Sequence, residues 1–429
     1  MEPPSPAPGL PMTHQALGTR ELSRVEFIGL CAGLMALNSL AIDVMLPALP
    51  AMGQALGVSN ENERQLVISA YMVGFGVAQL VFGPITDRFG RRAPLFIGMI
   101  IYIICAFAAT FAPTFAILLL IRVGQGIGAA ATRVISTSVI RDRFSGREMA
   151  AVMSLTFMVF MVLPIIAPGI GQLILLVGTW HDIFLFMTGL AAVILVWAYF
   201  RLPETLHPEY RRPLKLSVIS DGFRLVFANR TAIFYGFAGM FLFAANLGFI
   251  ISSQQIFVDI YNLGPFFPLA FASVAGLMAV SNFANSQLVR RFGQRRLSHF
   301  AIFVYIVCAV IMLGLSLMGP VPFWTFFVLL AIIQIFFGSS SSNMNSLAME
   351  PLGQVAGTAA AVFGFFQTVG GAVLGTLLGQ QFNGTLTPNA AGWLIVGVLV
   401  LACALIAEKG RLFGVGKEYE KSAVPLMAE

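Results

Sequence analysis

Long apolar stretches alternate with short polar stretches along almost the whole chain. A helix needs ~20 mostly apolar residues to cross the ~30 Å hydrocarbon core of a bilayer. Of the 429 residues, 58% are hydrophobic and only 10% are charged, which excludes a soluble globular fold. The sequence therefore predicts an all-α polytopic membrane protein with about twelve transmembrane helices. The predicted spans are 25–47, 64–83, 93–112, 115–140, 149–176, 181–200, 231–257, 264–289, 297–318, 321–346, 354–380 and 391–408.

The basic residues test this assignment independently of hydropathy, because Lys and Arg accumulate on the cytoplasmic side of spanning helices. With the N-terminus inside, all 25 of them except Arg64, Arg122 and Arg133 lie in tails or loops on that side. The net charge of +6 thus follows from topology and does not indicate nucleic-acid binding. Residues 1–19 contain no Lys or Arg, so we expect a retained first helix rather than a cleaved signal peptide.

A polar segment at 201–230 divides the predicted spans six and six. The string "FGPITDRFGRR" (Phe82 to Arg92) is echoed by "SQLVRRFGQRR" (Ser286 to Arg296), and each follows the second span of its half. The halves are therefore expected to be parallel repeats around a central cavity. The expected organisation is a disordered cytoplasmic tail (1–24), a first half (25–200), a cytoplasmic linker (201–230), a second half (231–408) and a cytoplasmic tail (409–429).

Residues for enzyme or metal chemistry are not grouped along the chain. The four cysteines lie inside apolar spans, and the four histidines are scattered over tails, loops and span ends. This pattern predicts no enzyme, no metal site and no cofactor. A phosphate-cradling G-x-x-x-x-G-K-[ST] motif is also absent from the sequence, so we expect energy to come from an ion gradient.

Four strings of the sequence resemble motifs of the major facilitator superfamily, and the resemblance runs from about Arg24 to Arg411. It is closest to the drug–proton antiporter branch, in particular to the bicyclomycin-resistance group of multidrug efflux proteins. Ala167 and Gln172 depart from the usual glycines of the fifth-helix motif, and Arg290 replaces the acid in the echo of the loop motif. The strings are "GPITDRFGRR" (Gly83 to Arg92), "RVGQG" (Arg122 to Gly126), "APGIGQ" (Ala167 to Gln172) and "AIDVMLPALP" (Ala41 to Pro50).

The loop motif is expected to act as a cytoplasmic latch. Asp87 would lie at the inner end of a helix, where a carboxylate can meet a helix N-terminus or an arginine. Glycines would allow the turn and close approach. The resemblance implies that this cluster holds the cytoplasmic side closed in the outward-facing state, whereas a topology anchor is the alternative for the arginines. The latch residues are Gly83, Asp87, Arg88, Gly90 and Arg91, and the echo is expected to lack an equivalent acid latch.

Away from the span ends, three charged residues lie well inside predicted spans, where each costs at least ~2.5–3.5 kcal/mol and is a functional hypothesis by default. Asp43 and Arg122 lie at similar depths on the outer half, which predicts an interacting pair that couples transport to protons; a static ion pair is the alternative. Arg133 follows Arg122 by three helical turns and faces the same way. For Arg133, snorkelling to the inner interface and contact with substrate remain alternatives.

Polar and adaptable side chains within the spans are candidates for lining the central cavity. These candidates are Asn38, Tyr71, Gln125, Arg133, Phe157, Met158, Phe241, Asn246, Gln254, Asn343 and Gln367. Small residues and prolines are candidates for close or bent helix packing. These are Gly126 in the fourth span and Pro164, Pro168 and Gly171 in the fifth span.

The leading functional hypothesis is a proton-coupled antiporter that exports drugs or other amphipathic small molecules by alternating access. The principal rival is a proton-coupled uptake symporter for a small organic metabolite, and a receptor or scaffold is a third alternative. We expect a monomer in the plasma membrane, which would be the bacterial inner membrane if the resemblance holds, with both termini cytoplasmic. Its expected partners are a small-molecule substrate, protons and lipid.

Overall fold

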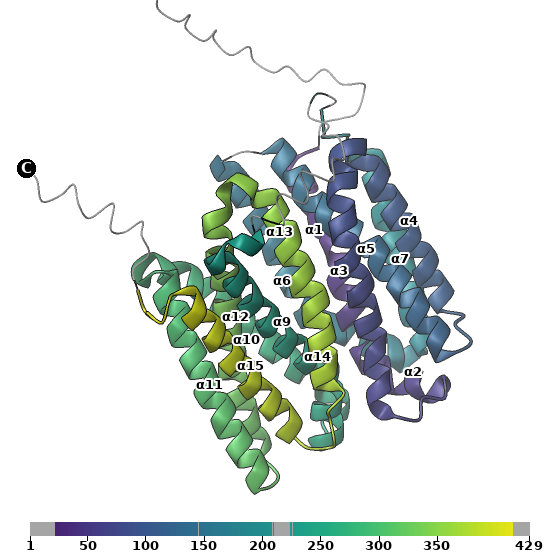
Figure 1. Cartoon of the computed structure of the whole chain (residues 1–429). Coiled ribbons are helices and arrows are strands. Elements are labelled where there is room, and N and C mark those ends of the chain that lie inside the picture. Colours follow the sequence, from purple (N-terminus) through teal and green to yellow (C-terminus); the bar gives the residue numbers. More distant parts are fainter. Residues whose placement is uncertain (1–21, 145, 208, 210–223, 225, 415–429) are drawn as a thin grey trace, which may run out of the picture.

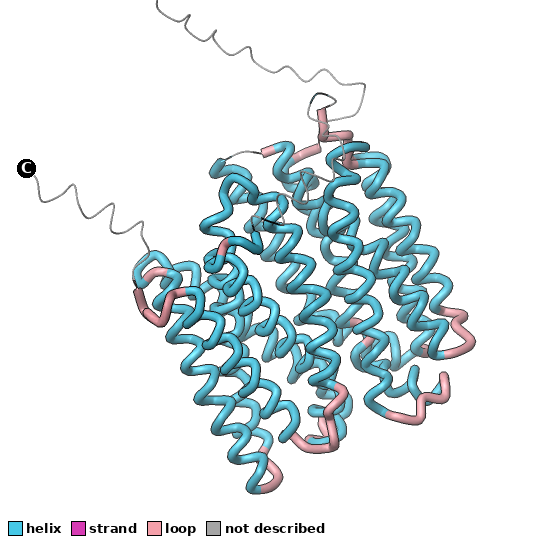
Figure 2. The backbone as a smooth tube through the Cα atoms, viewed as in Figure 1, coloured by secondary structure: helices cyan, strands magenta, loops and turns pink. Residues whose placement is uncertain are grey.

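The computed structural model describes residues 22–144, 146–207, 209, 224 and 226–414, and all regular structure in these ranges is helical. Figure 2 shows the helices joined mostly by short loops. The helices of the first half are α1 (Arg24–Asp43), α2 (Leu49–Ala55), α3 (Leu66–Phe89), α4 (Arg92–Ala109), α5 (Phe115–Arg143), α6 (Gly146–Val177) and α7 (Trp180–Arg201). Short 3₁₀ segments, η1 (Leu46–Ala48) and η2 (Glu61–Gln65), flank α2.

The second half repeats this order of long helices, with two π-helical segments. The elements are α9 (Arg230–Gln254), η4 (Gln255–Ile260), η5 (Gly264–Phe266), α10 (Phe267–Phe292), α11 (Gln294–Met318), α12 (Phe323–Met349), η6 (Glu350–Val355), α13 (Ala356–Phe365), η7 (Phe366–Gly370), α14 (Gly371–Gly379) and α15 (Thr387–Ala407). One π-helical segment, η4, ends the helix that corresponds to the seventh predicted span, and the other, η7, interrupts the helix that corresponds to the eleventh.

Eleven helical segments in the described ranges are long and apolar enough to cross a membrane. The apolar part of α6 found in these ranges, Val162–Val177, is shorter. Every predicted span coincides with one of these segments, so the prediction of an all-α fold with about twelve spans is confirmed. The outer surface carries large exposed apolar side chains, such as Leu120 (72% exposed) and Leu377 (57%). Such a surface suits hydrocarbon rather than water.

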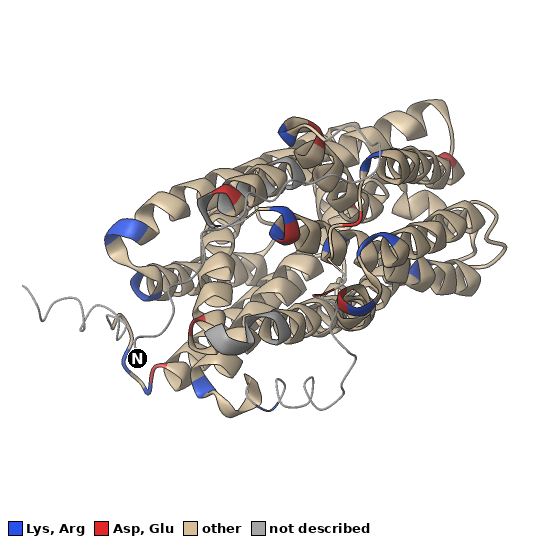
Figure 3. Cartoon of the chain, turned by 90° about the horizontal axis from the view of Figure 1, so that it is seen from above, with Lys and Arg blue, Asp and Glu red and all other residues tan. Residues whose placement is uncertain are grey.

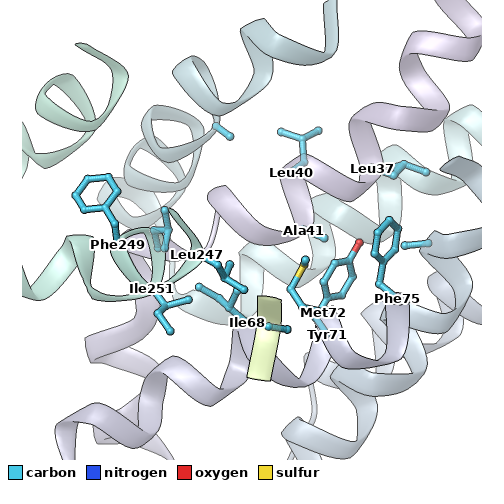
Figure 4. Packing of buried hydrophobic residues seen from close by; sticks show 14 of the residues in the cluster. Leu37, Leu40, Ala41, Ile68, Tyr71, Met72, Phe75, Leu247, Phe249 and Ile251 are labelled. Carbon is cyan, nitrogen blue, oxygen red and sulfur yellow. The ribbon is translucent and has the colours of Figure 1, made fainter. Parts of the chain in front are cut away.

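The helices form two bundles that lie side by side (Figure 1). Along the seam, α3 packs against α13, η7 and α14, and α6 packs against α10. One cluster of buried apolar residues crosses the seam; it includes Ile68 and Met72 from the first bundle and Leu247 and Ile251 from the second (Figure 4). Residues 1–21, 210–223 and 415–429 lie outside the described residues, so the tails and the linker stay predictions.

Two glycines named from the sequence lie where helices meet most closely. A Cβ at Gly126 of α5 would collide with the carbonyl oxygen of Tyr71 in α3. A Cβ at Gly171 of α6 would collide with the carbonyl oxygen of Val44, just after α1. Only glycine permits these contacts. Pro164 and Pro168 lie inside the 32-residue helix α6.

Candidate functional site

Arg122 of α5 is fully buried, and its hydrogen bonds connect α5 to α1 and α3. Its Nη2 donates to the carbonyl oxygen of Ala41 in α1 (2.8 Å), and its Nε donates to that of Val67 in α3 (3.1 Å). Its Nη1 donates to Oε1 of Gln125 (2.6 Å), and the guanidinium lies 4.5 Å from the centroid of the Tyr71 ring. The cation therefore has neutral partners on every side, including the ring face.

The carbonyl of Ala41 is available because α1 ends at Asp43. The last carbonyls of a helix lack intrahelical donors, and here the chain continues into η1 with Pro47 in its first turn. Arg122 satisfies one of these carbonyls. The arginine thus stabilises a break in the first spanning segment, and Asp43 is the last helical residue before that break.

Asp43 is 5% exposed and accepts a hydrogen bond from the Ser39 hydroxyl (2.9 Å). Within the described part of the chain, no ion pair includes Asp43, so the predicted contact with Arg122 does not form in this conformation. The reason is that backbone carbonyls and Gln125 occupy the arginine, which sequence spacing cannot reveal. Asp43 and Arg122 nevertheless meet the same helix break, and their role in proton coupling stays a prediction.

Three of the proposed cavity residues are covered by their own bundle. The Tyr71 hydroxyl donates to Oδ1 of Asn38 (2.9 Å), and Gln125 accepts from Arg122. Asn38 is 5% exposed, and Tyr71 and Gln125 are 0% exposed. They form one buried polar network with Arg122, so a solute cannot touch them in this conformation. Arg133, three turns further along α5, is exposed instead.

In the second bundle, two proposed cavity residues belong to pairs of amides. Asn343 of α12 and Asn285 of α10 exchange two hydrogen bonds of 3.1 Å each. Asn246 of α9 accepts from Nε2 of Gln334 in α12 (3.0 Å). The interior of this half is thus held together by neutral polar contacts.

The remaining candidates differ in exposure. Gln254 is 4% exposed, and its Oε1 has no hydrogen-bond partner among the described residues. Met158 is 59% exposed, whereas Phe241 and Gln367 are half-buried. The side chain of Phe157 lies outside the described residues. Contact with substrate stays a prediction for all of them.

A polar seam that the sequence analysis missed joins the two halves at the end of α3 near η2. Arg64 forms an ion pair with Asp259 of η4 (3.1 Å). Nε2 of Gln65 donates to Oε1 of Gln255 (2.5 Å). Arg64 was visible in the sequence as a basic residue outside the cytoplasmic segments, but its partner in the other half was not.

Asn62 continues this seam by donating to two carbonyl oxygens beyond α14. These belong to Gln380 (3.0 Å) and Phe382 (2.7 Å). In return, Nε2 of Gln380 donates to the carbonyl oxygen of Asn62 (2.6 Å). A surface pocket of ≈ 540 Å³ lies beside these residues. The halves are therefore closed against each other at this end of the seam.

The loop after α3, at the opposite end, is organised around Arg91, which is 3% exposed. Its Nη1 lies 2.7 Å from Oδ1 of Asp87, and its Nε lies 2.8 Å from Oδ2 of Asp142 at the end of α5. Burial lowers the pKa of Arg91, but its hydrogen bonds and ion pairs with Asp142 and Asp87 outweigh this effect and raise it. Arg91 is therefore a permanent cation between two acids, and Asp87 meets an arginine as expected.

Gly90 makes the tight turn of this loop with φ 94°, a conformation that favours glycine. The carboxylate of Glu204, beyond α7, accepts from the backbone nitrogens of Arg91 (2.8 Å) and Arg92 (3.1 Å). A Cβ at Gly90 would lie 2.6 Å from Oε2 of Glu204. At Gly83, by contrast, a Cβ would meet nothing within 4 Å, so close packing does not require glycine there.

The echo in the second half also holds an arginine between two acids, contrary to our expectation. Arg295 lies 2.8 Å from Oε2 of Glu350 at the end of α12 and 2.8 Å from Oε1 of Glu408 after α15. The Tyr235 hydroxyl also donates to Glu408 (2.7 Å). The acids come from distant helix ends rather than from the echo itself, so the string alone could not show them. Figure 3 shows charged segments from both halves at this end.

The comparisons with known proteins agree with this architecture. The Bicyclomycin resistance protein homolog of Haemophilus influenzae is 30% identical over 83% of this chain and 89% of its own length. The Multidrug resistance protein D of Escherichia coli is 28% identical over 87% of this chain and 93% of its own length. Among solved structures, the xylose transporter XylE from E. coli in a partially occluded inward-open conformation has a TM-score of 0.70 at 13% identity. The match covers 90% of this chain and 99% of that chain.

The family model described as Major Facilitator Superfamily matches residues 31–376. This range includes the loop at 83–92, the buried Arg122 and most of both bundles. The resemblance found in the sequence motifs is thereby confirmed. The chain belongs to the Major Facilitator Superfamily.

Proposed function

We propose that the chain is a secondary active transporter that exports amphipathic small molecules in exchange for protons. One observation of the structure carries the alternating-access part of this proposal. Among the described residues, every hydrogen bond and ion pair that joins the two halves uses residues 62–79 of the first half. Polar contacts therefore join the halves from the start of α3 to about its middle. Among the described residues, no hydrogen bond or ion pair joins the halves at the other end, where the arginine clusters lie.

The distribution of basic residues suggests which side is closed. The loops with Arg91 and Arg295 belong to the cytoplasmic side under the positive-inside rule. The seam at Arg64 and Asp259 would then face outward, and this conformation would be open to the cytoplasm. Export requires such a state to load its substrate, followed by opening of the seam to release it outside.

The direction of transport is supported by the relatives. One is named for bicyclomycin resistance and another for multidrug resistance. For a membrane transporter, a role in resistance to a compound that acts inside the cell implies export of that compound. A solved structure of similar fold is that of a D-xylose-proton symporter, so an uptake carrier for a small metabolite is the rival that an experiment must exclude.

We assign proton coupling to Asp43. It is covered, it lies at the α1 break, and no cation among the described residues pairs with it. An unpaired buried charge is costly, so we expect Asp43 to stay protonated while it is covered. Opening of the α1 break to water should then allow Asp43 to release its proton. Arg122 would keep the break in shape during this step.

Inside-out membrane vesicles with an acidified lumen test this function. Addition of an exported compound is expected to release protons from the lumen, which a pH-sensitive dye reports as a recovery of fluorescence. Asp43→Asn vesicles provide the matched control and are expected to show no release. A substrate that leaves the gradient unchanged, or that enters intact cells together with protons, would contradict antiport.

Orientation has its own test. A cysteine introduced at Gln294 is expected to resist an impermeant thiol reagent in intact cells, whereas one at Asn262 is expected to react. The same protection is expected at Ser145, which lies outside the described residues. Strong labelling at Gln294 would reverse the topology without affecting the family assignment.

A further inference from the structure

Arg133 occupies an unusual place in the first bundle. It lies ten residues before the end of α5, which is ~15 Å along the helix axis. It is exposed, although its neighbours Thr132 and Ile135 are fully buried. Its guanidinium carbon lies 5.9 Å from the centroid of the Phe75 ring. Phe75 is 1% exposed and packs beside Tyr71 in the interior (Figure 4).

This position separates the two alternatives that the sequence left open. Phe75 lies fourteen residues before the end of α3, or ~21 Å along its axis. A side chain that snorkels extends toward the membrane interface. Because Arg133 stays near Phe75, it does not reach the interface in this conformation. The guanidinium therefore lies in an accessible space inside the protein.

No hydrogen bond or ion pair to a described residue occupies the guanidinium of Arg133. In contrast, Arg122 has three acceptors, and Arg91 lies between two carboxylates. The buried acid of the first bundle, Asp43, is 5% exposed and bound to Ser39. A charged residue inside a spanning helix that faces an accessible space, with no acid to pair with, is by default a candidate for contact with the transported molecule.

We propose that Arg133 binds the negatively charged group of the transported molecule, and that this molecule is an organic anion with one carboxylate or sulfonate on an apolar body. The planar guanidinium offers parallel donors that match an oxyanion. The Phe75 ring and the apolar walls of the bundle suit the rest of such a molecule. The inference rests on the proposed transport function and specifies its substrate class.

Direct binding to the purified full-length protein in detergent tests this proposal without a proton gradient. The probes are phenyl and naphthyl alkanoates, each compared with its neutral primary amide, and calorimetry measures the affinity. We expect the carboxylates to bind at least ~10-fold more tightly than the amides. Arg133→Gln should remove this preference, and Arg133→Lys should retain part of it because the charge remains but the planar fork is lost.

Arg141→Gln is the matched control, because it removes an exposed cation from the last turn of the same helix. It should leave the preference for carboxylates unchanged. Amide binding by Arg133→Gln, equal to that of the wild type, would show that the variant is folded. The proposal is overturned if the wild type binds acids no better than amides, if no carboxylate in the set binds, or if Arg133→Gln keeps the preference. Anion binding without proton release would instead contradict only the coupling to protons.

Discussion

The loop at 82–92 of the first half and the loop at 286–296 of the second half have the same backbone turn but different charge patterns. Gly90 and Gly293 end their helices with φ 94° and 79°. In each loop, an arginine is held between two carboxylates. The groups are Arg91 with Asp87 and Asp142, and Arg295 with Glu350 and Glu408. The repeat therefore preserves a three-dimensional arrangement more faithfully than it preserves sequence positions.

The two clusters differ in whether an acid binds the backbone or the side chains of the loop. In the first half, Glu204 binds backbone nitrogens next to the turn, so the main chain itself is held. In the second half, the corresponding helix-end acid, Glu408, binds the side chains of Arg295 and Tyr235. Each cluster lies within its own bundle. Among the described residues, the ion pairs of neither cluster join the two bundles.

The interiors of the halves differ more strongly than their loops. The first bundle contains Asp43, Arg122 and Arg133, whereas the second holds the amide pairs Asn285–Asn343 and Asn246–Gln334. Neutral amides stabilise helix contacts but do not exchange protons at physiological pH. Substitutions of these residues in the first bundle should therefore abolish proton coupling or anion binding, whereas substitutions of the amides in the second bundle should preserve both.

The largest expected effect comes from Asp43→Asn. This variant should lose proton-driven accumulation of substrate in vesicles while keeping downhill exchange. The amide has nearly the same size as the carboxyl group but cannot bind and release a proton. Arg122→Ala should impair both activities, since the α1 break would lose the donor to Ala41.

Asn285→Ala is the comparison in the second bundle. It leaves one amide of the pair unsatisfied, so it should lower stability by ~1–3 kcal/mol, yet the protein that remains should stay coupled. Uphill transport by Asp43→Asn with a normal pH dependence would assign coupling to another acid, such as Glu350.

The loop clusters should give the next largest effects. Asp87→Asn is expected to reduce transport more than protein abundance, by about fivefold, because an exposed ion pair contributes up to ~1 kcal/mol. Glu408→Gln should reduce transport to a similar or greater extent, since Glu408 is the more buried acid and serves two partners. Transport rates normalised to protein in the membrane measure both. Wild-type rates in both variants would leave the loops with a role in topology alone.

The two turn glycines offer a smaller and sharper comparison by thermal unfolding in detergent. Gly293→Ala should cost ~1–2 kcal/mol from its positive φ alone, because nothing lies within 4 Å of the added Cβ. Gly90→Ala should cost more, because the Cβ would also displace Glu204 from the backbone nitrogens. Equal losses of stability would show that Glu204 does not hold the first loop.

The smallest effects are expected for the exposed arginines that precede these turns. Arg88→Ala and Arg290→Ala remove side chains for which no ion pair occurs among the described residues. Each should change stability by less than ~0.5 kcal/mol and leave transport near the wild-type rate. A loss comparable with that of Asp87→Asn would place the arginine in the latch, as the family motif implied.

Hydrophobic patterning by itself determined the helical fold and the position of nearly every spanning segment. The reason is local: a bilayer satisfies no backbone polar groups, so each apolar stretch of sufficient length must form a helix. The loop at 83–92, the buried Arg122 and the close contacts at Gly126 and Gly171 were also identifiable from short motifs. These features depend on residue type within one segment or between neighbouring segments.

Only the tertiary structure decided which polar groups meet. Arg122 binds the carbonyl oxygens of Ala41 and Val67 instead of Asp43. Unpaired backbone carbonyls occur where a helix ends, and the residue type does not reveal them. The acids around Arg295 and the partner of Arg64 come from the ends of distant helices, which hydropathy places only to within a few residues. The packing of α5 against α3 likewise covers Tyr71 and leaves Arg133 accessible, because exposure depends on how bundles separate and not on the residues along one helix.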